Sequence, residues 1–385
     1  MKILIINNIP TPYRNFFYEE VSNEGLKRGV VFTIAFQAEK GVSHIKKYKI
    51  WWTLDDLKFN FNHFFSKNIF GKRHIYHSRW SVNFDILIHM LTKKYDVILA
   101  PPSMSIFNWI YCILPSRASK VLYSETNLHV SSTGKGVMNT VRKLLFSNFD
   151  AIAVPGKYAS DWLYAINPKL KEKPALHLPN VIDFNTFNLE AFKDKSKVDY
   201  KTKYDLPLDK IIITAIGIAD YKGKRKLIES TKNVEGDYLI LILGGGDTFD
   251  DYHELIKQQE SEDKVALLGN KSEDEVREYL FLSDWFMHPS SFDPSPLVLL
   301  EAAFMGLPLA ATSQTGNTPE LVIENENGYL FDYNEDFSPI LRKMIHTPQS
   351  DLIKMGQKSL EIAHQNFDSS LICEKLVSEL LKLNK

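Results

Sequence analysis

Two carboxylates, Asp293 and Glu301, are the residues whose type and spacing point most directly to chemistry. Glu301 interrupts an otherwise apolar run, where a lone carboxylate is costly unless it is paired. The vicinal hydroxyls of a ribose would be a suitable partner, and so would a structural Arg, Lys or backbone N–H group. Asp293 precedes a proline in a loop, so it serves either turn formation or hydrogen bonding to sugar hydroxyls.

A helix is expected to begin between these two carboxylates. Ser295 is a good N-cap residue, and Pro296 suits the first helical position ahead of the apolar run from Leu297. The free N–H groups of the first turn and the helix dipole then form a site for an anion such as a diphosphate.

Apolar, β-rich segments alternate with segments of helical periodicity along the chain, which predicts an α/β protein with parallel sheets. Strands are predicted at residues 2–6, 31–36, 97–100, 121–124 and 151–154, and again at 211–216, 238–243, 265–268, 285–287 and 309–311. Because ligands of such sheets bind beyond the carboxyl ends of the strands, the loop that contains Asp293 lies where a site is expected.

The length of 385 residues favours two domains. A charged stretch over residues 190–210 separates the two series of strands. We therefore expect an N-terminal domain at residues 1–190 and a C-terminal domain at 204–360. The last helical stretch, residues 351–381, is long enough to return across the first domain, and a C-terminal helix at residues 361–385 is expected to pack back on that domain.

The composition of the chain limits the cellular location and the kinds of binding partner that can be expected. Only two cysteines are present, which argues against a disulfide framework, and no apolar run is long enough to span a bilayer. The apolar start is too short for a signal peptide, so a cytoplasmic protein is expected. Through Asn185 the chain has 24 Lys+Arg against 13 Asp+Glu, which favours an anionic membrane surface or a phosphate-bearing acceptor for that half. No nucleic-acid motif accompanies the charge.

The spacing of Asp293 and Glu301, followed by Gly-Leu-Pro at 306–308, Thr-Pro-Glu at 318–320 and Asn-Gly at 327–328, resembles the donor-binding signature of retaining GT-B glycosyltransferases of the family 4 (group 1) type. The resemblance implies two Rossmann-like domains facing an interdomain cleft. It also implies a nucleotide-sugar donor, a glycan or lipid-linked glycan acceptor, and neither a cofactor nor a metal. Asp293 stands where the family usually has Glu.

The resemblance assigns donor-binding roles to residues around the second sheet. Gly217 and Lys222 resemble the family's Gly-Arg...Lys-Gly segment, in which the Lys neutralises the diphosphate. Ile218 stands where Arg is usual, so one phosphate contact is either lost or supplied by Lys224 or Arg225. The other residues assigned to the donor are Leu268, Gly269, Ser295, Pro296, Leu297 and Glu301. Without the resemblance, the basic stretch at residues 222–226 would be interpreted as the solvent-exposed start of a helix.

In the first domain, the segment Thr11, Pro12, Tyr13 and Arg14 resembles a family turn that faces the cleft and contacts acceptor or donor phosphate. A structural ion pair is an equal alternative for Arg14. Many relatives have a His at the end of the strand at 121–124, near the sugar.

Here Glu125 occupies that strand end and His129 follows it. Either is a candidate to face the donor, and both join Asp293 as candidate catalytic residues. Taken alone, His129 reads as a surface histidine.

Residues 40–80 interleave basic residues with large aromatics, a pattern that suits docking on an anionic membrane, although aromatics of an ordinary core are the alternative. The predicted function is transfer of a sugar from a UDP-sugar, rather than a GDP-sugar, in bacterial surface polysaccharide synthesis such as lipopolysaccharide or capsule. A catalytically silent partner of a transferase and a sugar-nucleotide epimerase of the same fold remain alternatives. A nicotinamide oxidoreductase is disfavoured because no Gly-x-Gly-x-x-Gly follows the first strand.

Overall fold

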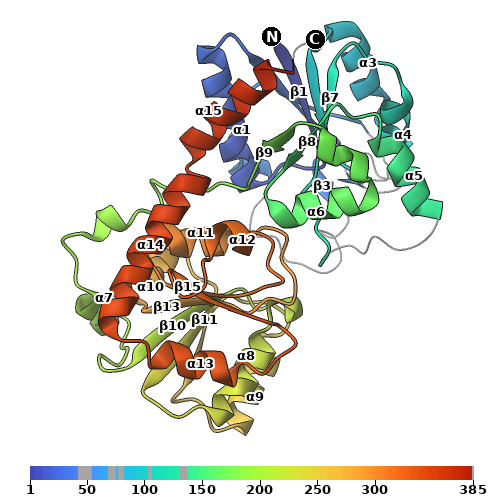
Figure 1. Cartoon of the computed structure of the whole chain (residues 1–385). Coiled ribbons are helices and arrows are strands. Elements are labelled where there is room, and N and C mark those ends of the chain that lie inside the picture. Colours follow the sequence, from blue (N-terminus) through green and yellow to red (C-terminus); the bar gives the residue numbers. More distant parts are fainter. Residues whose placement is uncertain (42–53, 68–74, 77–81, 103–105, 130–136, 384–385) are drawn as a thin grey trace. The chain divides into compact units, whose positions relative to one another are not determined.

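The fold is that of a computed structural model, which describes residues 1–41, 54–67, 75–76, 82–102, 106–129 and 137–383 (Figure 1). The chain divides into two compact units. Unit 1 comprises Met1–Val181 together with Ser369–Lys385, and unit 2 comprises Ile182–Asp368. The chain therefore passes from unit 1 to unit 2 and returns to unit 1 at its end.

Unit 1 is built on a seven-stranded parallel sheet in the order β4-β2-β1-β6-β7-β8-β9. Its strands are β1 (Lys2–Asn7), β2 (Val31–Phe36), β4 (His63–Phe65), β6 (Val97–Ala100), β7 (Ser119–Tyr123), β8 (Ala151–Val154) and β9 (Ala175–His177). A separate two-stranded sheet pairs β3 (Lys40–Gly41) with β5 (Ile75–Tyr76). Its helices are α1 (Pro12–Lys27), α3 (Phe84–Lys93), α4 (Ile106–Ile113), α5 (Val137–Phe146), α6 (Lys157–Ile166) and α15 (Ser369–Leu381), with 3-10 turns η1 (Leu54–Asp56) and η2 (Pro168–Glu172).

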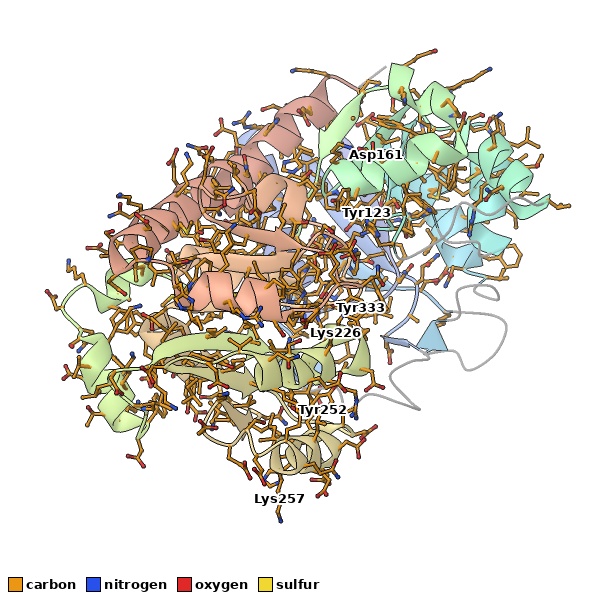
Figure 2. The ribbon with its side chains drawn as sticks, turned by 60° about the horizontal axis from the view of Figure 1, so that its bottom comes forward. Tyr123, Asp161, Lys226, Tyr252, Lys257 and Tyr333 are labelled. Carbon is orange, nitrogen blue, oxygen red and sulfur yellow. The ribbon has the colours of Figure 1, made fainter. Side chains whose placement is uncertain are left out.

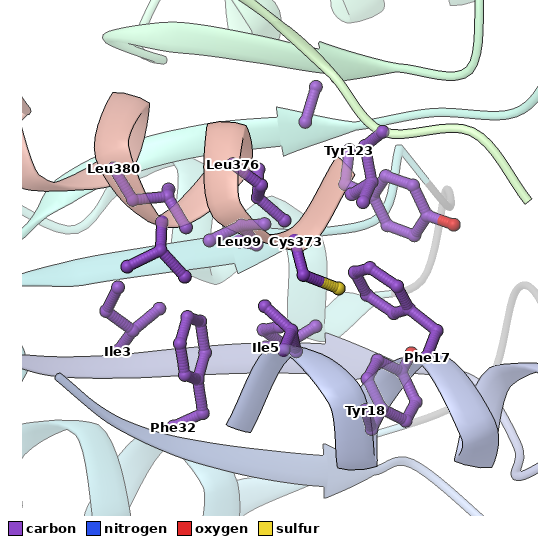
Figure 3. Close-up of a cluster of buried hydrophobic side chains, with 14 of the residues drawn as sticks. Ile3, Ile5, Phe17, Tyr18, Phe32, Leu99, Tyr123, Cys373, Leu376 and Leu380 are labelled. Carbon is purple, nitrogen blue, oxygen red and sulfur yellow. The ribbon is translucent and has the colours of Figure 1, made fainter. Parts of the chain in front are cut away.

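Each face of the unit 1 sheet has its own core, because side chains of a strand alternate between the two faces. On one face, Ile3 and Ile5 of β1 meet α1 and α15, and α15 contributes Cys373, Leu376 and Leu380 (Figure 3). On the other face, Leu4 and Ile6 meet α3, α4, α5 and α6. The last helix of the chain is thus an integral part of the first unit.

Unit 2 is built on a six-stranded parallel sheet in the order β12-β11-β10-β13-β14-β15. Its strands are β10 (Ile211–Ile216), β11 (Tyr238–Leu243), β12 (Val265–Gly269), β13 (Trp285–His288), β14 (Leu309–Thr312) and β15 (Gly328–Phe331). Its helices are α7 (Lys197–Lys203), α8 (Lys224–Ser230), α9 (Phe249–Gln258), α10 (Glu273–Leu282), α11 (Leu297–Phe304), α12 (Thr318–Leu321), α13 (Ser338–Ile345) and α14 (Gln349–Phe367), with 3-10 turns η3 (Leu189–Phe192), η4 (Asp220–Lys222) and η5 (Thr231–Asn233).

The expected α/β architecture with two parallel sheets is confirmed, and all ten predicted strands are present. The helical stretch predicted over residues 351–381 is present as two helices, α14 and α15. It is broken at Asp368, whose extended backbone (φ −60°, ψ 120°) ends α14 before α15 begins. The break falls where the chain leaves unit 2.

The interpretation of the aromatics in residues 40–80 as a membrane-docking element fails where the structure describes them. Phe61 is buried in the unit 1 core, and Phe59 and Phe65 pack against it. Phe36 of β2 stacks on Phe65 with ring centroids 5.3 Å apart. The remaining basic and aromatic residues of that segment within 42–53, 68–74 and 77–81 lie outside the described residues. In the described parts, no helix is long and apolar enough to cross a bilayer.

Candidate active site

The carboxyl ends of β10 and β13 bring Lys222, Asp293 and His288 together. Lys222 ends η4 in the loop after β10, and its ammonium group forms an ion pair with the Asp293 carboxylate. His288 is the last residue of β13 and is fully buried, with Nε2 3.4 Å from Asp293 Oδ2. Two residues predicted for the donor site therefore meet, and a third, not predicted, lies behind them.

The ionisation of this cluster follows from burial and charge. Burial alone would raise the pKa of Asp293, but the neighbouring His288 imidazole and the positive Lys222 hold it well below its usual range. Burial lowers the pKa of His288 to about 4, although Asp293 opposes this shift. At neutral pH the cluster thus contains an ionised carboxylate, a neutral imidazole and an ammonium group.

Close backbone packing fixes the loop that carries Lys222 against the loop that carries Asp293. A Cβ atom at Gly223 would lie 1.8 Å from the carbonyl oxygen of Pro289, and Gly223 has φ +69°. The Tyr221 carbonyl accepts a hydrogen bond from the Ser291 N–H at 2.7 Å. The Tyr221 ring also stacks on Phe292 with centroids 4.9 Å apart. Only glycine fits at position 223, so this contact sets the position of Lys222.

Of the two residues considered for the missing phosphate contact, Lys224 is buried, and Arg225 is exposed but lies against the Tyr252 ring. Lys224 is fully buried and donates to the Lys222 carbonyl at 3.2 Å. Arg225 lies over the Tyr252 ring, 5.6 Å from its centroid. Ile218, which stands where the resemblance leads one to expect Arg, is part of the apolar core. Lys222 is therefore the cation at this end of β10 whose ammonium group reaches Asp293.

Next along α8, Lys226 turns toward the end of β15. Its ammonium group lies 5.3 Å from the centre of the Tyr333 ring, and the two residues are drawn in Figure 2. It also donates a hydrogen bond to the Tyr333 carbonyl. Lys226 therefore has a structural role, because it ties α8 to the segment that follows β15.

The helix after Asp293 begins later than the sequence indicates. α11 starts at Leu297 with Pro296 as its N-cap, and no side chain caps it, so the prediction of Ser295 as N-cap is wrong. The extended conformation of Pro296 (φ −68°, ψ 123°) excludes it from the first turn. Asn317 donates to the Pro296 carbonyl at 3.2 Å and anchors this end. The first N–H groups of α11 still follow directly after the Asp293 loop.

Glu301 lies on the part of α11 that reaches solvent, one turn after Leu297, while Leu299, Leu300 and Ala302 are buried. Among the residues that the structure describes, the Glu301 carboxyl has neither a hydrogen-bond nor an ion-pair partner. Burial, with a smaller contribution from the Glu273 carboxylate, raises the pKa of Glu301 to about 8. The structural Arg or Lys considered as its partner is therefore absent from the described part of the chain.

Glycine turns shape the neighbouring strand ends. Gly217 follows β10 with φ +83°, and a Cβ atom on Gly244 would lie 3.3 Å from the Gly217 Cα atom. Gly269 ends β12 with φ +69°, and its carbonyl accepts from the Gly244 N–H at 2.8 Å. The space beside Gly269 is open, since a Cβ atom there would meet nothing within 4 Å, and Leu268 directly precedes Gly269 in β12.

In unit 1 the candidates Arg14 and Glu125 contact each other. Thr11 is the N-cap of α1, and Pro12, Tyr13 and Arg14 form its first turn, so this segment is a helix start. The buried Arg14 guanidinium forms an ion pair with Glu125. Burial raises the pKa of Glu125 to about 7, although the hydrogen bond with the Asn180 side chain opposes this shift.

His129 is exposed, and its ring packs edge-on against Tyr158 with centroids 5.3 Å apart. Its N–H group donates to the Asn127 side chain at 3.0 Å. The structure therefore brings Glu125, and not His129, to the buried cluster with Arg14 and Tyr123, whose hydroxyl donates to Glu125.

His288 is the site residue that the sequence reasoning missed. A polar side chain at the last position of a buried strand, five residues before Asp293, was the available signal. In the described ranges, no three His, Cys, Asp or Glu side chains converge as metal ligands.

Residues 197–359 match the family model "Glycosyl transferases group 1". N-acetyl-alpha-D-glucosaminyl L-malate synthase of Bacillus anthracis is 26% identical over 201 residues, which are 51% of this chain and 51% of that protein. Lipopolysaccharide core biosynthesis glycosyltransferase LpsE of Rhizobium meliloti is 28% identical over 166 residues, 42% of this chain and 47% of that protein. The chain thus spans about half the length of these curated relatives.

The fold has a solved counterpart over nearly its whole length. The structure of Anabaena Alr3699/HepE in complex with UDP superimposes with a TM-score of 0.72 and 17% identity, covering 99% of this chain and 100% of that chain. The fold is therefore GT-B, with two Rossmann-like units, and residues 197–359 carry a glycosyl transferases group 1 domain.

Proposed function

We propose that this protein is a retaining glycosyltransferase of the family 4 type, which moves a sugar from a nucleotide-sugar to a glycan or lipid-linked glycan. The observation that carries the proposal is the Glu301 carboxyl, which has no partner in the described structure although it lies on the apolar helix α11, just after the loop of Asp293. This carboxyl therefore has its hydrogen-bonding capacity free for an external donor. The vicinal hydroxyls of a ribose supply two.

The neighbouring residues suit the rest of a donor. The Lys222 ammonium group and the N–H groups of the first turn of α11 bind the diphosphate, because both carry positive charge at the strand ends. Asp293 is held ionised and accepts hydrogen bonds from sugar hydroxyls. Leu268 and Gly269 adjoin the base, where the glycine turns leave room. A UDP-sugar is favoured over a GDP-sugar, and the Anabaena neighbour with bound UDP supports this choice.

The reaction then needs no protein nucleophile. The acceptor oxygen forms a bond to the anomeric carbon as the bond from that carbon to the diphosphate oxygen breaks. Both events take place on the same face of the sugar, and the acceptor proton passes to the leaving phosphate. Lys222 and the α11 N–H groups stabilise the negative charge that develops on the diphosphate, so no metal and no cofactor are required.

Unit 1 supplies the acceptor contacts in this proposal. Arg14 and Glu125 form a buried pair, with Thr11, Pro12 and Tyr13 on the same helix start. Glu125, with its raised pKa, orients the acceptor hydroxyl, and Arg14 holds Glu125. The setting is bacterial surface polysaccharide synthesis on the cytoplasmic side of the membrane, which the similarity to LpsE, a lipopolysaccharide core enzyme by name, supports.

The test combines binding and turnover. Thermal shift with UDP- and GDP-sugars, with and without EDTA, is measured on the wild-type protein and on Glu301→Gln. A nucleotide-sugar at 100 times its dissociation constant should stabilise the wild-type protein by about 2.7 kcal/mol. Sugar transfer to water or to a glycan acceptor is then measured as the amount of nucleotide diphosphate released.

Each result has a distinct meaning. Binding that depends on Glu301 together with release of the diphosphate supports the transferase. Binding without release supports a catalytically silent partner, which the apolar Ile218 in place of Arg keeps open. An altered nucleotide-sugar that still carries its diphosphate supports an epimerase. Absence of binding to any nucleotide-sugar by the folded protein would overturn the proposal.

A further inference from the structure

A row of exposed apolar side chains lies along one layer of unit 1. The helices α3, α4 and α5 cover the same face of the sheet, because their buried residues share one core with strands β1, β6, β7 and β8 (Figure 1). Large apolar residues point away from that core. They are Ile88 (60% exposed), Leu91 (74%), Ile113 (71%), Leu114 (39%) and Leu144 (66%). Such a set on one face marks an interaction surface.

The topology places these residues at one edge. In a parallel sheet, each helix runs back to the amino end of the next strand, so the carboxyl ends of α3, α4 and α5 lie beside the starts of β6, β7 and β8. These three strands are neighbours in the sheet. Leu91, Leu114 and Leu144 stand near the three helix ends, so the apolar row follows this edge of unit 1.

Basic residues alternate with the apolar row. They are Lys93, Lys94, Arg117 and Lys143, and all four are exposed. None of them forms an ion pair with any residue in the described part of the chain. We name these four and the five apolar residues together the α3–α5 surface.

The acidic residues beside this edge are already engaged. The Asp96 carboxylate accepts from the Lys2 backbone N–H at 2.7 Å, and Asp150 accepts from the Lys120 backbone N–H at 2.8 Å. Both carboxylates are thus occupied by hydrogen bonds from backbone N–H groups near the starts of strands. The charge that the α3–α5 surface presents outward is positive.

The helix ends that carry the surface are fixed from inside. The buried Lys120 ammonium group donates to the carbonyls of Tyr111 at 3.0 Å and Leu114 at 2.6 Å, at the end of α4. Lys173 donates to the Ser147 carbonyl at 2.9 Å, just after α5. These hydrogen bonds fix the ends of α4 and α5, so the exposed leucines at those ends are held in fixed positions.

We propose that the α3–α5 surface docks on the anionic surface of a lipid bilayer. A bilayer interface accepts side chains that insert a short apolar body, and its anionic headgroups attract the lysines and arginine around them. A soluble acidic protein would satisfy the charges but would leave five apolar side chains without a matching apolar layer. The inference concerns unit 1 alone, and its test needs no donor or acceptor, so it stands or fails independently of the catalytic proposal.

The experiment is co-sedimentation of the full chain with vesicles of phosphatidylcholine alone and with vesicles that also contain phosphatidylglycerol. Wild-type protein is expected to co-sediment with the anionic vesicles and not with the neutral ones. Lys93→Glu with Lys143→Glu should weaken binding more than tenfold, because each basic residue near an anionic surface contributes about fivefold. Leu91→Ser with Ile113→Ser should weaken it comparably.

Matched controls come from unit 2. Lys232→Glu with Lys257→Glu, and Leu208→Ser with Ile353→Ser, make the same changes at exposed positions and should leave vesicle binding unchanged. All variants alter exposed side chains, so thermal unfolding should report a folded protein in each case.

Three results would overturn the proposal. The first is wild-type protein that does not bind anionic vesicles. The second is binding that survives both double substitutions in the α3–α5 surface, which would place the membrane contact elsewhere in the chain. The third is a dimer that Leu91→Ser with Ile113→Ser dissociates, in protein that does not bind vesicles, which would assign the surface to a second copy.

Discussion

Replacing Glu301 with Gln offers the sharpest check on the donor site, because the two side chains differ in charge but hardly in shape. The carboxyl of Glu301 has no partner in the described structure, and its pKa is raised to about 8. Only the ionised form can accept hydrogen bonds from both hydroxyls of a ribose. Affinity for a nucleotide-sugar should therefore increase with pH as this group ionises.

The magnitude follows from the ionised fraction. With a pKa of about 8, the fraction is roughly 1% at pH 6, about 9% at pH 7 and about half at pH 8. Because the apparent dissociation constant equals the intrinsic constant divided by the competent fraction, it should fall about fifty-fold from pH 6 to pH 8. Glu301→Gln should bind weakly and show no such trend.

The effect on stability without ligand has the opposite sign. The pKa of Glu301 is higher in the folded protein than the 4.5 of an unperturbed carboxyl. Its contribution to stability is therefore complete below about pH 4.5 and is lost as pH rises through about 8. Glu301→Gln should lose less stability than the wild-type protein over that window.

Calorimetric titration with a UDP-sugar suits this measurement, since the pyrophosphate diester of such a ligand does not titrate between these pH values. Glu273→Gln provides a second variant, because the exposed Glu273 carboxylate contributes to the raised pKa of Glu301. It should shift the binding profile toward lower pH. A wild-type affinity that is flat from pH 6 to pH 8, or a pH trend that persists in Glu301→Gln, would refute the reasoning.

Three further predictions concern the same framework. Gly223→Ala should destabilise the protein by more than about 1 kcal/mol in urea unfolding, since its Cβ would collide with the Pro289 carbonyl at a positive φ; an unchanged midpoint would contradict the packing. Lys222→Met should weaken UDP binding about tenfold to a hundredfold in calorimetry, because it removes the cation paired with Asp293, and equal affinities would exclude Lys222 from the phosphate site. Leu376→Ala should cost about 2–5 kcal/mol of unfolding free energy, and a loss below about 1 kcal/mol would show that α15 is not part of the unit 1 core.

The strands were the most predictable part of this fold. A buried parallel strand is a short, continuous apolar run, and residues 31–36, 97–100 and 238–243 match β2, β6 and β11 in full. The strands that were not predicted are all short: β4, β9 and β15 have three or four residues each, and β3 and β5 have two. β4 reads His-Phe-Phe inside an aromatic-rich segment, so only its pairing with β2 distinguishes it from a loop.

Helix ends and the site were less predictable, because they depend on contacts between distant segments. Pro296 could begin a helix, but the anchoring of its carbonyl by Asn317 keeps it outside α11. The pairing of Lys222 with Asp293 joins residues 71 positions apart, and no local pattern reports it. The isolation of Glu301 could be suspected from its apolar neighbours, yet its lack of a structural partner could be established only in three dimensions.

The return of the chain to unit 1 has a consequence for biosynthesis. Leu376, Val377 and Leu380 complete the core that contains Ile3 and Phe32, although they are made after the whole of unit 2. During translation, the face of the first sheet that α15 covers stays open until α15 leaves the ribosome, and all of Ile182–Asp368 emerges before it. The second unit can therefore mature first, and an incomplete chain that stops before Ser369 would expose an apolar face that chaperones and proteases recognise.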